Sequence, residues 1–281
     1  MSKYDNLIAK FTEFARKRDD MIAVIVIGSQ SRKDVPADEY SDLDIIAVVK
    51  NPGNFLADNN WIEYLGEYGI SFVEDTIYGN KERRVLFRNG LDVDFVFITH
   101  TTAQSDLNSD EGKMILQKGY RVLVDKTGLA SCLPVTAMPQ YVFPEKDEFI
   151  NNINDFWYHT VWTAKKLLRG EIWAAKFCLD SYMKYKVLWM MELQSRAING
   201  LDYDTWFNGR FVDTWASVEA LDGLKSTFAH YNYDDIRRAL FSTMDLYHDI
   251  AIDTAKKTGY TYPIDAENCA RECLKRLLEL P

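Results

Sequence analysis

The chain has 281 residues, of which 47% are hydrophobic, which is enough for one large domain or two ordinary ones with a full core. No run approaches the roughly 18 apolar residues of a membrane span and the N-terminus lacks a signal peptide's apolar core, so we expect a cytoplasmic protein. The net charge of −9 disfavours a long nucleic-acid partner and favours a small cationic one.

The first predicted elements alternate between helix and strand. Apolar residues at helical spacing predict an amphipathic helix over residues 3–18. A run rich in β-branched residues predicts a buried strand over 22–27, and a second apolar run predicts another over 45–49. A turn is expected at 51–53, a helix over 60–68 and a strand over 71–77.

A hairpin is predicted next. The strand over 81–87 and the return strand over 91–98 flank Asn89-Gly90, a strong signal for a two-residue hairpin. A helix over 103–118 and a short strand over 121–124 follow. The hairpin makes part of the sheet antiparallel, so we predict an α+β catalytic domain with a mixed sheet and flanking helices, and not a doubly wound dinucleotide fold.

The second half has a different pattern. Pro134, Pro139 and Pro144 mark a segment that sustains neither helix nor strand, and we place a linker over 134–144 there. After it, apolar residues recur at three- and four-residue spacing. The predicted organisation is therefore an α+β domain over 1–133, the linker, and a helical bundle over 145–281.

Two short motifs carry the chemistry. Gly28 and Ser29 end the first strand, where a glycine lets backbone N–H groups close on a phosphate and the serine hydroxyl adds a donor. Asp42 and Asp44 lie two residues apart as the second strand begins, so both carboxylates face the same side of the sheet. Hard anionic oxygen ligands at this spacing suit Mg²⁺ bound to nucleotide phosphates.

A third carboxylate is expected from the hairpin. Asp92 and Asp94 share one face of the return strand. If that strand lies beside the one that carries Asp44, one of the two reaches the same metal site and could also accept the proton of an attacking hydroxyl. Each motif alone is commonplace, but their order on three successive strands is specific.

These motifs resemble a known family. MIAVIVIGSQS, YSDLDIIAVV and VDFVFI are similar to the nucleotidyltransferase superfamily of DNA polymerase β, and NDFWYHTVWTAKKLLRGEIWAAKF resembles the aminoglycoside 6-adenylyltransferases, which inactivate streptomycin. The resemblance implies that Asp42, Asp44 and Asp94 are catalytic metal ligands. It favours Asp94 over Asp92 because the family places an apolar residue, here Val93, before the acid.

The resemblance also implies which residues bind the nucleotide. Gly28, Ser29, Ser31 and Arg32 are the candidates in the first domain. The family commonly carries arginine directly after Gly-Ser, whereas this chain has Gln30 there. Either Arg32 takes over the contact with phosphate or that role is lost.

The helical domain supplies the remaining candidates. Asp155, Trp157 and Asp180 are predicted to bind the acceptor, because an acid beside an aromatic ring suits guanidinium or ammonium groups. Lys165 is predicted to meet a nucleotide phosphate. Asp155 and Lys165 stand at matching places in the family resemblance. The alternatives are that Trp157 packs in the core and that Asp155 or Asp180 only pairs with neighbouring lysines.

The sequence thus predicts Mg²⁺-dependent transfer of AMP from ATP to an aminoglycoside hydroxyl, foremost the 6-hydroxyl of streptomycin, with release of pyrophosphate. A second hypothesis keeps this chemistry with a lincosamide or another acceptor. A third is a degenerate protein that binds nucleotide as a sensor or partner-binding module.

Overall fold

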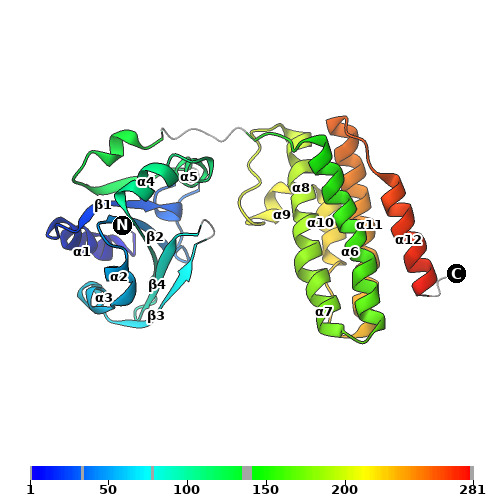
Figure 1. The fold of residues 1–281 in the computed structure, drawn as a ribbon, viewed down its shortest axis with the longest axis horizontal. Coiled ribbons are helices and arrows are strands. Elements are labelled where there is room, and N and C mark those ends of the chain that lie inside the picture. The colour runs from blue at the N-terminus through cyan, green and yellow to red at the C-terminus, as the bar shows by residue number, and fades with distance from the viewer. Residues whose placement is uncertain (1, 33–34, 77–78, 135–140, 279–281) are drawn as a thin grey trace. The chain divides into compact units, whose positions relative to one another are not determined.

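The computed structural model describes residues 2–32, 35–76, 79–134 and 141–278 (Figure 1). The chain divides into two compact units, Met1–Pro139 and Gln140–Pro281. Residues 135–140 of the predicted linker lie outside the described residues. Within the described ranges, no helix has both the length and the apolar character needed to cross a membrane.

The first unit is built on a mixed six-stranded sheet, as predicted. Its strands lie in the order β3-β4-β5-β2-β1-β6. The central pair, β2 and β5, is parallel, and the other neighbours are antiparallel. The strand bounds are β1 Met21–Ile27, β2 Leu43–Val49, β3 Tyr68–Asp75, β4 Lys81–Phe87, β5 Asp92–Ile98 and β6 Arg121–Asp125.

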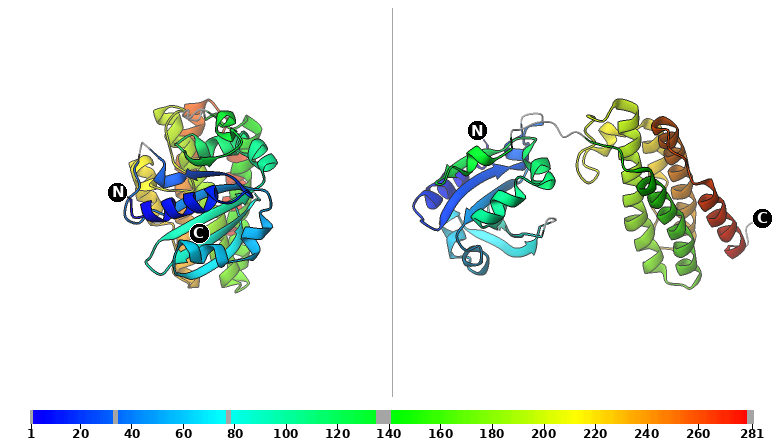
Figure 2. Two further views of the ribbon diagram at one scale, coloured as in Figure 1. Left: turned by 90° about the vertical axis from the view of Figure 1, so that its left-hand side faces the viewer. Right: turned by 45° about the horizontal axis from the view of Figure 1, so that its top comes forward.

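Helices cover both faces of this sheet (Figure 2). On one face Phe11 of α1 and Trp61 of α3 pack on Phe95, and on the other Ala103 of α4 and Leu116 of α5 pack against the sheet. The period-two alternation of the strands sends side chains into both layers. The helix bounds are α1 Asp5–Arg16, α2 Gly53–Ala57, α3 Asn60–Leu65, α4 His100–Asp106 and α5 Asp110–Leu116.

Several predicted boundaries were wrong. The helix expected over 103–118 is two helices, because Ser109 accepts a hydrogen bond from the backbone of Gly112 and starts α5. The hairpin forms, but Phe87 pairs with Leu91, so the loop has three residues, 88–90, and not two. This shifts the expected pairing between β4 and β5 by one residue and places Arg84 opposite Asp94.

The second unit is helical, as predicted. Its buried residues form one hydrophobic core that α6, α8 and α11 share (Figure 1). Between α7 and α8 the chain makes a π-helical turn, η3, over Cys178–Tyr182. The other bounds are α6 Lys146–Leu168, α7 Ile172–Phe177, α8 Met183–Asn199, α9 Val212–Trp215, α10 Val218–Lys225, α11 Tyr233–Thr258 and α12 Ile264–Leu277.

Candidate active site

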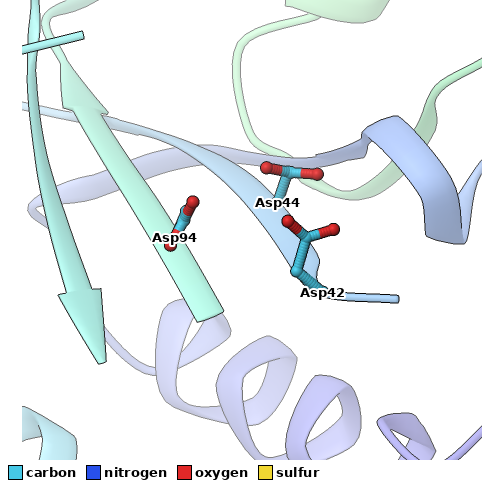
Figure 3. Close-up of side chains that lie close together, drawn as sticks. All are labelled: Asp42, Asp44 and Asp94. Atoms are coloured by element: carbon cyan, nitrogen blue, oxygen red, sulfur yellow. The ribbon is translucent and has the colours of Figure 1, made fainter. Parts of the chain in front are cut away.

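Three aspartates meet at one end of the β2–β5 pair (Figure 3). Asp42, Asp44 and Asp94 each offer a carboxylate oxygen, and these oxygens lie within 4.8 Å of one another. Asp44 stands opposite Asp94 in the parallel register, while Asp42 lies just before β2 begins. The topology thus brings the pair Asp42 and Asp44 together with Asp94, which lies 50 residues further along the chain.

The turn after β1 approaches this cluster closely. Gly28 has φ of +63° and opens η1 (Gly28–Gln30). A Cβ atom at Gly28 would lie 2.2 Å from Oδ2 of Asp44. The missing side chain therefore leaves room for the Asp44 carboxylate, and the left-handed backbone is a second reason for glycine at this position.

The polar residues after Gly28 hold the backbone that carries Asp42. The Ser29 hydroxyl donates to the Asp42 carbonyl at 3.0 Å, and Nε2 of Gln30 donates to the same oxygen at 3.1 Å. The Ser31 hydroxyl lies 3.1 Å from the Gly28 carbonyl and 3.0 Å from that of Gly119. These side chains fix the turn, and Arg32 follows it with its backbone N–H on Gly28.

The third carboxylate lies in an environment that disfavours its charge. The pKa of Asp94 is raised to about 6, mainly by burial and also by the nearby carboxylates of Glu82, Asp42 and Asp92. Nη2 of Arg84, 2.9 Å from Oδ2 of Asp94, opposes this shift. Three crowded carboxylates with hard oxygen donors are the ligand set that a divalent cation such as Mg²⁺ takes, and such a cation would relieve their mutual repulsion.

Asp92, the alternative third carboxylate, has a different neighbour. Its Oδ1 accepts a hydrogen bond of 2.9 Å from the Tyr4 hydroxyl, while Asp94 joins the cluster. Sequence reasoning missed the contacts of Tyr4, Gln30 and Arg84. A three-residue hairpin loop would have paired Arg84 with Asp94, but no pattern in the sequence pointed to Tyr4.

In the helical unit, Asp155 is surrounded by donors. The Tyr182 hydroxyl lies 2.7 Å from its Oδ2, and Lys186 Nζ lies 2.7 Å from the same oxygen. Nδ1 of His159 lies 2.7 Å from Oδ1. Burial raises the pKa of Asp155, but the hydrogen bonds from Lys186 and Tyr182 outweigh it, so the pKa lies below its usual range.

The other three candidates of this unit lie in different surroundings. Trp157 is 1% exposed and its indole N–H donates to the Tyr262 hydroxyl at 2.9 Å, so the ring fills the core. Asp180 lies in η3, pairs with Lys176, and lines a pocket of about 350 Å³. Lys165 is exposed on α6.

Comparison with known proteins assigns the amino-acid sequence to a family. The family model described as streptomycin adenylyltransferase matches residues 1–277. The chain belongs to this family.

Curated relatives carry the names of adenylyltransferases. The chain is 24% identical to an aminoglycoside 6-adenylyltransferase of Bacillus subtilis (strain 168), over 90% of each chain. It is 22% identical to a protein of the same name from Staphylococcus aureus, again over 90% of each. A crystal structure of an aminoglycoside 6-adenyltransferase from Bacillus subtilis is 21% identical, covers 97% of this chain and 98% of its own, and gives a TM-score of 0.45.

Proposed function

We propose that the chain transfers AMP from ATP to a hydroxyl of an aminoglycoside, foremost the 6-hydroxyl of streptomycin, and releases pyrophosphate. The main support for this proposal is the cluster of Asp42, Asp44 and Asp94 beside the Gly28 turn, in a member of the streptomycin adenylyltransferase family. Aminoglycoside 6-adenylyltransferases are also the curated relatives that match most of the chain.

The proposed reaction is a displacement at the α-phosphorus of ATP. The acceptor oxygen forms a bond to that phosphorus, the bond to the bridging oxygen of the β-phosphate breaks, and pyrophosphate leaves. Asp42, Asp44 and Asp94 hold Mg²⁺, which when bound neutralises phosphate charge. Asp94 lies on the strand beside Asp44 and is our candidate to accept the hydroxyl proton. Backbone groups of the Gly28 turn hold the departing phosphates.

We assign the cation of the acceptor to the pocket that contains Asp180. Tyr185 and Phe228 line the same pocket, so an acid and aromatic rings stand together there. Lys184 also lines it, with its Nζ 3.9 Å from Oδ1 of Asp180 and 5.1 Å from the centre of the Phe228 ring, so an acceptor cation would take the place of this ammonium group. That combination binds guanidinium groups through charge-assisted hydrogen bonds and cation–π contact. Streptomycin carries such groups, and the net charge of −9 favours its approach.

The first experiment measures pyrophosphate released from ATP and Mg²⁺ with and without streptomycin, followed by mass spectrometry of the drug. We expect streptomycin-dependent release and one added AMP. If pyrophosphate is released with a lincosamide or another acceptor but not with streptomycin, the proposed substrate is wrong and the proposed mechanism stands. ATP binding without release for any acceptor would favour the sensor hypothesis.

Single substitutions test the carboxylates. We expect Asp42→Asn and Asp44→Asn to leave the fold intact by circular dichroism and to lower the transfer rate to the background, because each removes a metal ligand. Asp75→Asn changes an exposed aspartate at the end of β3 and serves as the control with the parent rate. A parent rate in either cluster variant would contradict the assignment.

A further pair of substitutions tests the acceptor pocket. Asp180→Asn should raise the KM for streptomycin about tenfold with a smaller change in kcat, the size expected for one charge-assisted hydrogen bond. Asp249→Asn, in a separate pocket between α10 and α11, should leave both constants unchanged. The reverse result would move the cation site to the second pocket.

A further inference from the structure

The first residues of the chain are fastened to the segments that carry the metal-site carboxylates. The Ser2 hydroxyl donates to Oε1 of Gln30 at 2.9 Å, and Lys3 Nζ donates to the Glu39 carbonyl at 2.8 Å. Gln30 in turn donates to the Asp42 carbonyl. The N-terminal segment thus contacts the Gln30 side chain in the turn after β1 and the backbone at Glu39, three residues before Asp42.

Tyr4 makes the most central of these contacts. Its side chain is fully buried, and its hydroxyl lies 3.1 Å from the Ser41 carbonyl, 3.0 Å from the Asp92 carbonyl and 2.9 Å from Oδ1 of Asp92. Ser41 directly precedes Asp42, and Asp92 stands two residues before Asp94. One hydroxyl therefore bridges the two chain segments that enter the carboxylate cluster.

The sheet does not fix both segments equally. Asp44 and Asp94 are paired in the β2–β5 ladder, whereas Asp42 lies outside β2. The position of Asp42 depends instead on contacts to its own backbone, from Ser29 and Gln30, and to the preceding carbonyl, from Tyr4. Because three carboxylates repel one another when no cation is bound, contacts of this kind hold them within ligand distance.

We propose that Tyr4 is a positioning residue of the metal site, whose hydroxyl sets the distance between Asp42 and Asp94. The inference rests on the proposed function of that site. It assigns Tyr4 no contact with metal or nucleotide; Tyr4 acts through the backbone of Ser41 and through Asp92.

The protonation of Tyr4 suits this role. Burial, together with the hydrogen bond to the Asp92 carboxylate, raises the pKa of Tyr4 well above its usual range. The hydroxyl therefore keeps its proton near neutral pH and remains a donor, and its single hydrogen is shared among the three oxygens around it.

Binding of Mn²⁺ to the full chain without nucleotide, followed by electron paramagnetic resonance, tests the proposal. Tyr4→Phe keeps the buried ring and removes the hydroxyl. We expect the variant to fold and its Mn²⁺ affinity to fall about tenfold, as for losses of other groups that orient metal ligands.

Two control variants separate positioning from general destabilisation. Tyr120→Phe removes a hydroxyl that lies 3.3 Å from the Pro134 carbonyl in the same unit. Phe11→Leu weakens the packing of α1, the helix that directly follows Tyr4. Both should unfold at lower temperature and bind Mn²⁺ with the parent affinity.

Asp44→Asn, measured in the same titration, distinguishes an error about the role of Tyr4 from an error about the metal site itself. If Asp44→Asn loses Mn²⁺ and Tyr4→Phe binds it like the parent, only the role of Tyr4 is overturned. A parent chain that binds no Mn²⁺, or Asp44→Asn with parent affinity, would overturn the metal site and the role of Tyr4 together. A Tyr4→Phe chain that does not fold, or an equal loss of affinity in Phe11→Leu, would make Tyr4 a determinant of stability and overturn the proposal.

Discussion

At the scale of single residues, the candidate site depends on small groups that leave room for the carboxylates. Gly28 is the clearest case, because the Asp44 carboxylate occupies the space that any side chain at Gly28 would take. The Asp44 carboxylate is the far end of a flexible side chain. A larger residue at position 28 is therefore expected to displace the carboxylate more than the backbone.

Gly28→Ala should accordingly affect metal binding more than folding. We expect a loss of Mn²⁺ affinity of about tenfold or more, and a loss of stability of about 1–2 kcal/mol from the left-handed backbone. Gly128→Ala is the matched control, since Gly128 also has a positive φ, of +79°, and a Cβ atom there meets nothing within 4 Å. Metal titration and denaturant unfolding of both variants give the comparison. Equal effects on affinity would contradict the role of Gly28.

A residue of the site could be predicted when a local sequence pattern marks it, and could not be predicted when its role depends on contacts with residues far away in the chain. Asp44 and Asp94 lie on strands whose apolar runs are evident in the sequence, and Asp42 directly precedes one of them, so their meeting could be predicted from period-two alternation and the adjacency of strands. Tyr4 acts across 37 residues to Ser41 and 88 to Asp92, and nothing local marks such a contact. The Gln30 side chain donates a hydrogen bond to the Asp42 carbonyl. An amide donor could equally bind a phosphate, so the residue type alone does not predict which role it has.

At the scale of elements, type and order were predictable and register was not. Asn89-Gly90 indicates a hairpin whether the loop has two residues or three, but the two loops differ by one residue in pairing. The three-residue loop places Arg84 beside Asp94. Likewise residues 103–118 were predicted as one helix, whereas the hydrogen bond from the Gly112 N–H to the Ser109 hydroxyl marks the start of a second helix.

Helix α8 contains a glutamate, Glu192, whose charged form is disfavoured by burial. Glu192 lies between the buried Met191 and Leu193, and burial raises its pKa to about 7, while Arg196 opposes the shift. The folded chain therefore binds a proton here that the unfolded chain has already lost. Its free energy of unfolding falls as pH rises from the ordinary pKa of glutamate towards 7.

Glu192→Gln removes this dependence. At pH 8 we expect the variant to be more stable than the parent by about 1–3 kcal/mol, with the difference gone near pH 4.5. Urea denaturation at the two pH values measures it. Glu272→Gln, at an exposed position of α12, is the control and should show no such difference. A gain for Glu192→Gln that is the same at both pH values would refute the explanation.

At the scale of the whole molecule, each unit has a hydrophobic core made from its own residues. The three aspartates, the Gly28 turn and Tyr4 all belong to the first unit. The candidate metal site is therefore complete within that unit, whereas Asp155 and Asp180 belong to the second.

Residues 1–139 produced alone should fold, and should bind Mn²⁺ within about threefold of the affinity of the full chain, because every proposed metal ligand and support is present. They should not transfer AMP to streptomycin, since the proposed acceptor residues are missing. Circular dichroism, metal titration and the pyrophosphate assay test the three statements. A folded fragment without metal affinity would show that the site needs the helical unit.

Separate cores also bear on how such a protein changes over generations. A substitution that reshapes the Asp180 pocket changes the stability of the helical core. It leaves the packing around Asp42, Asp44 and Asp94 unchanged, because that packing belongs to a separate core. If the helical unit recognises the acceptor, as proposed, lineages under selection by a new antibiotic can change acceptor recognition in one half of the gene while the proposed metal site in the other half stays intact.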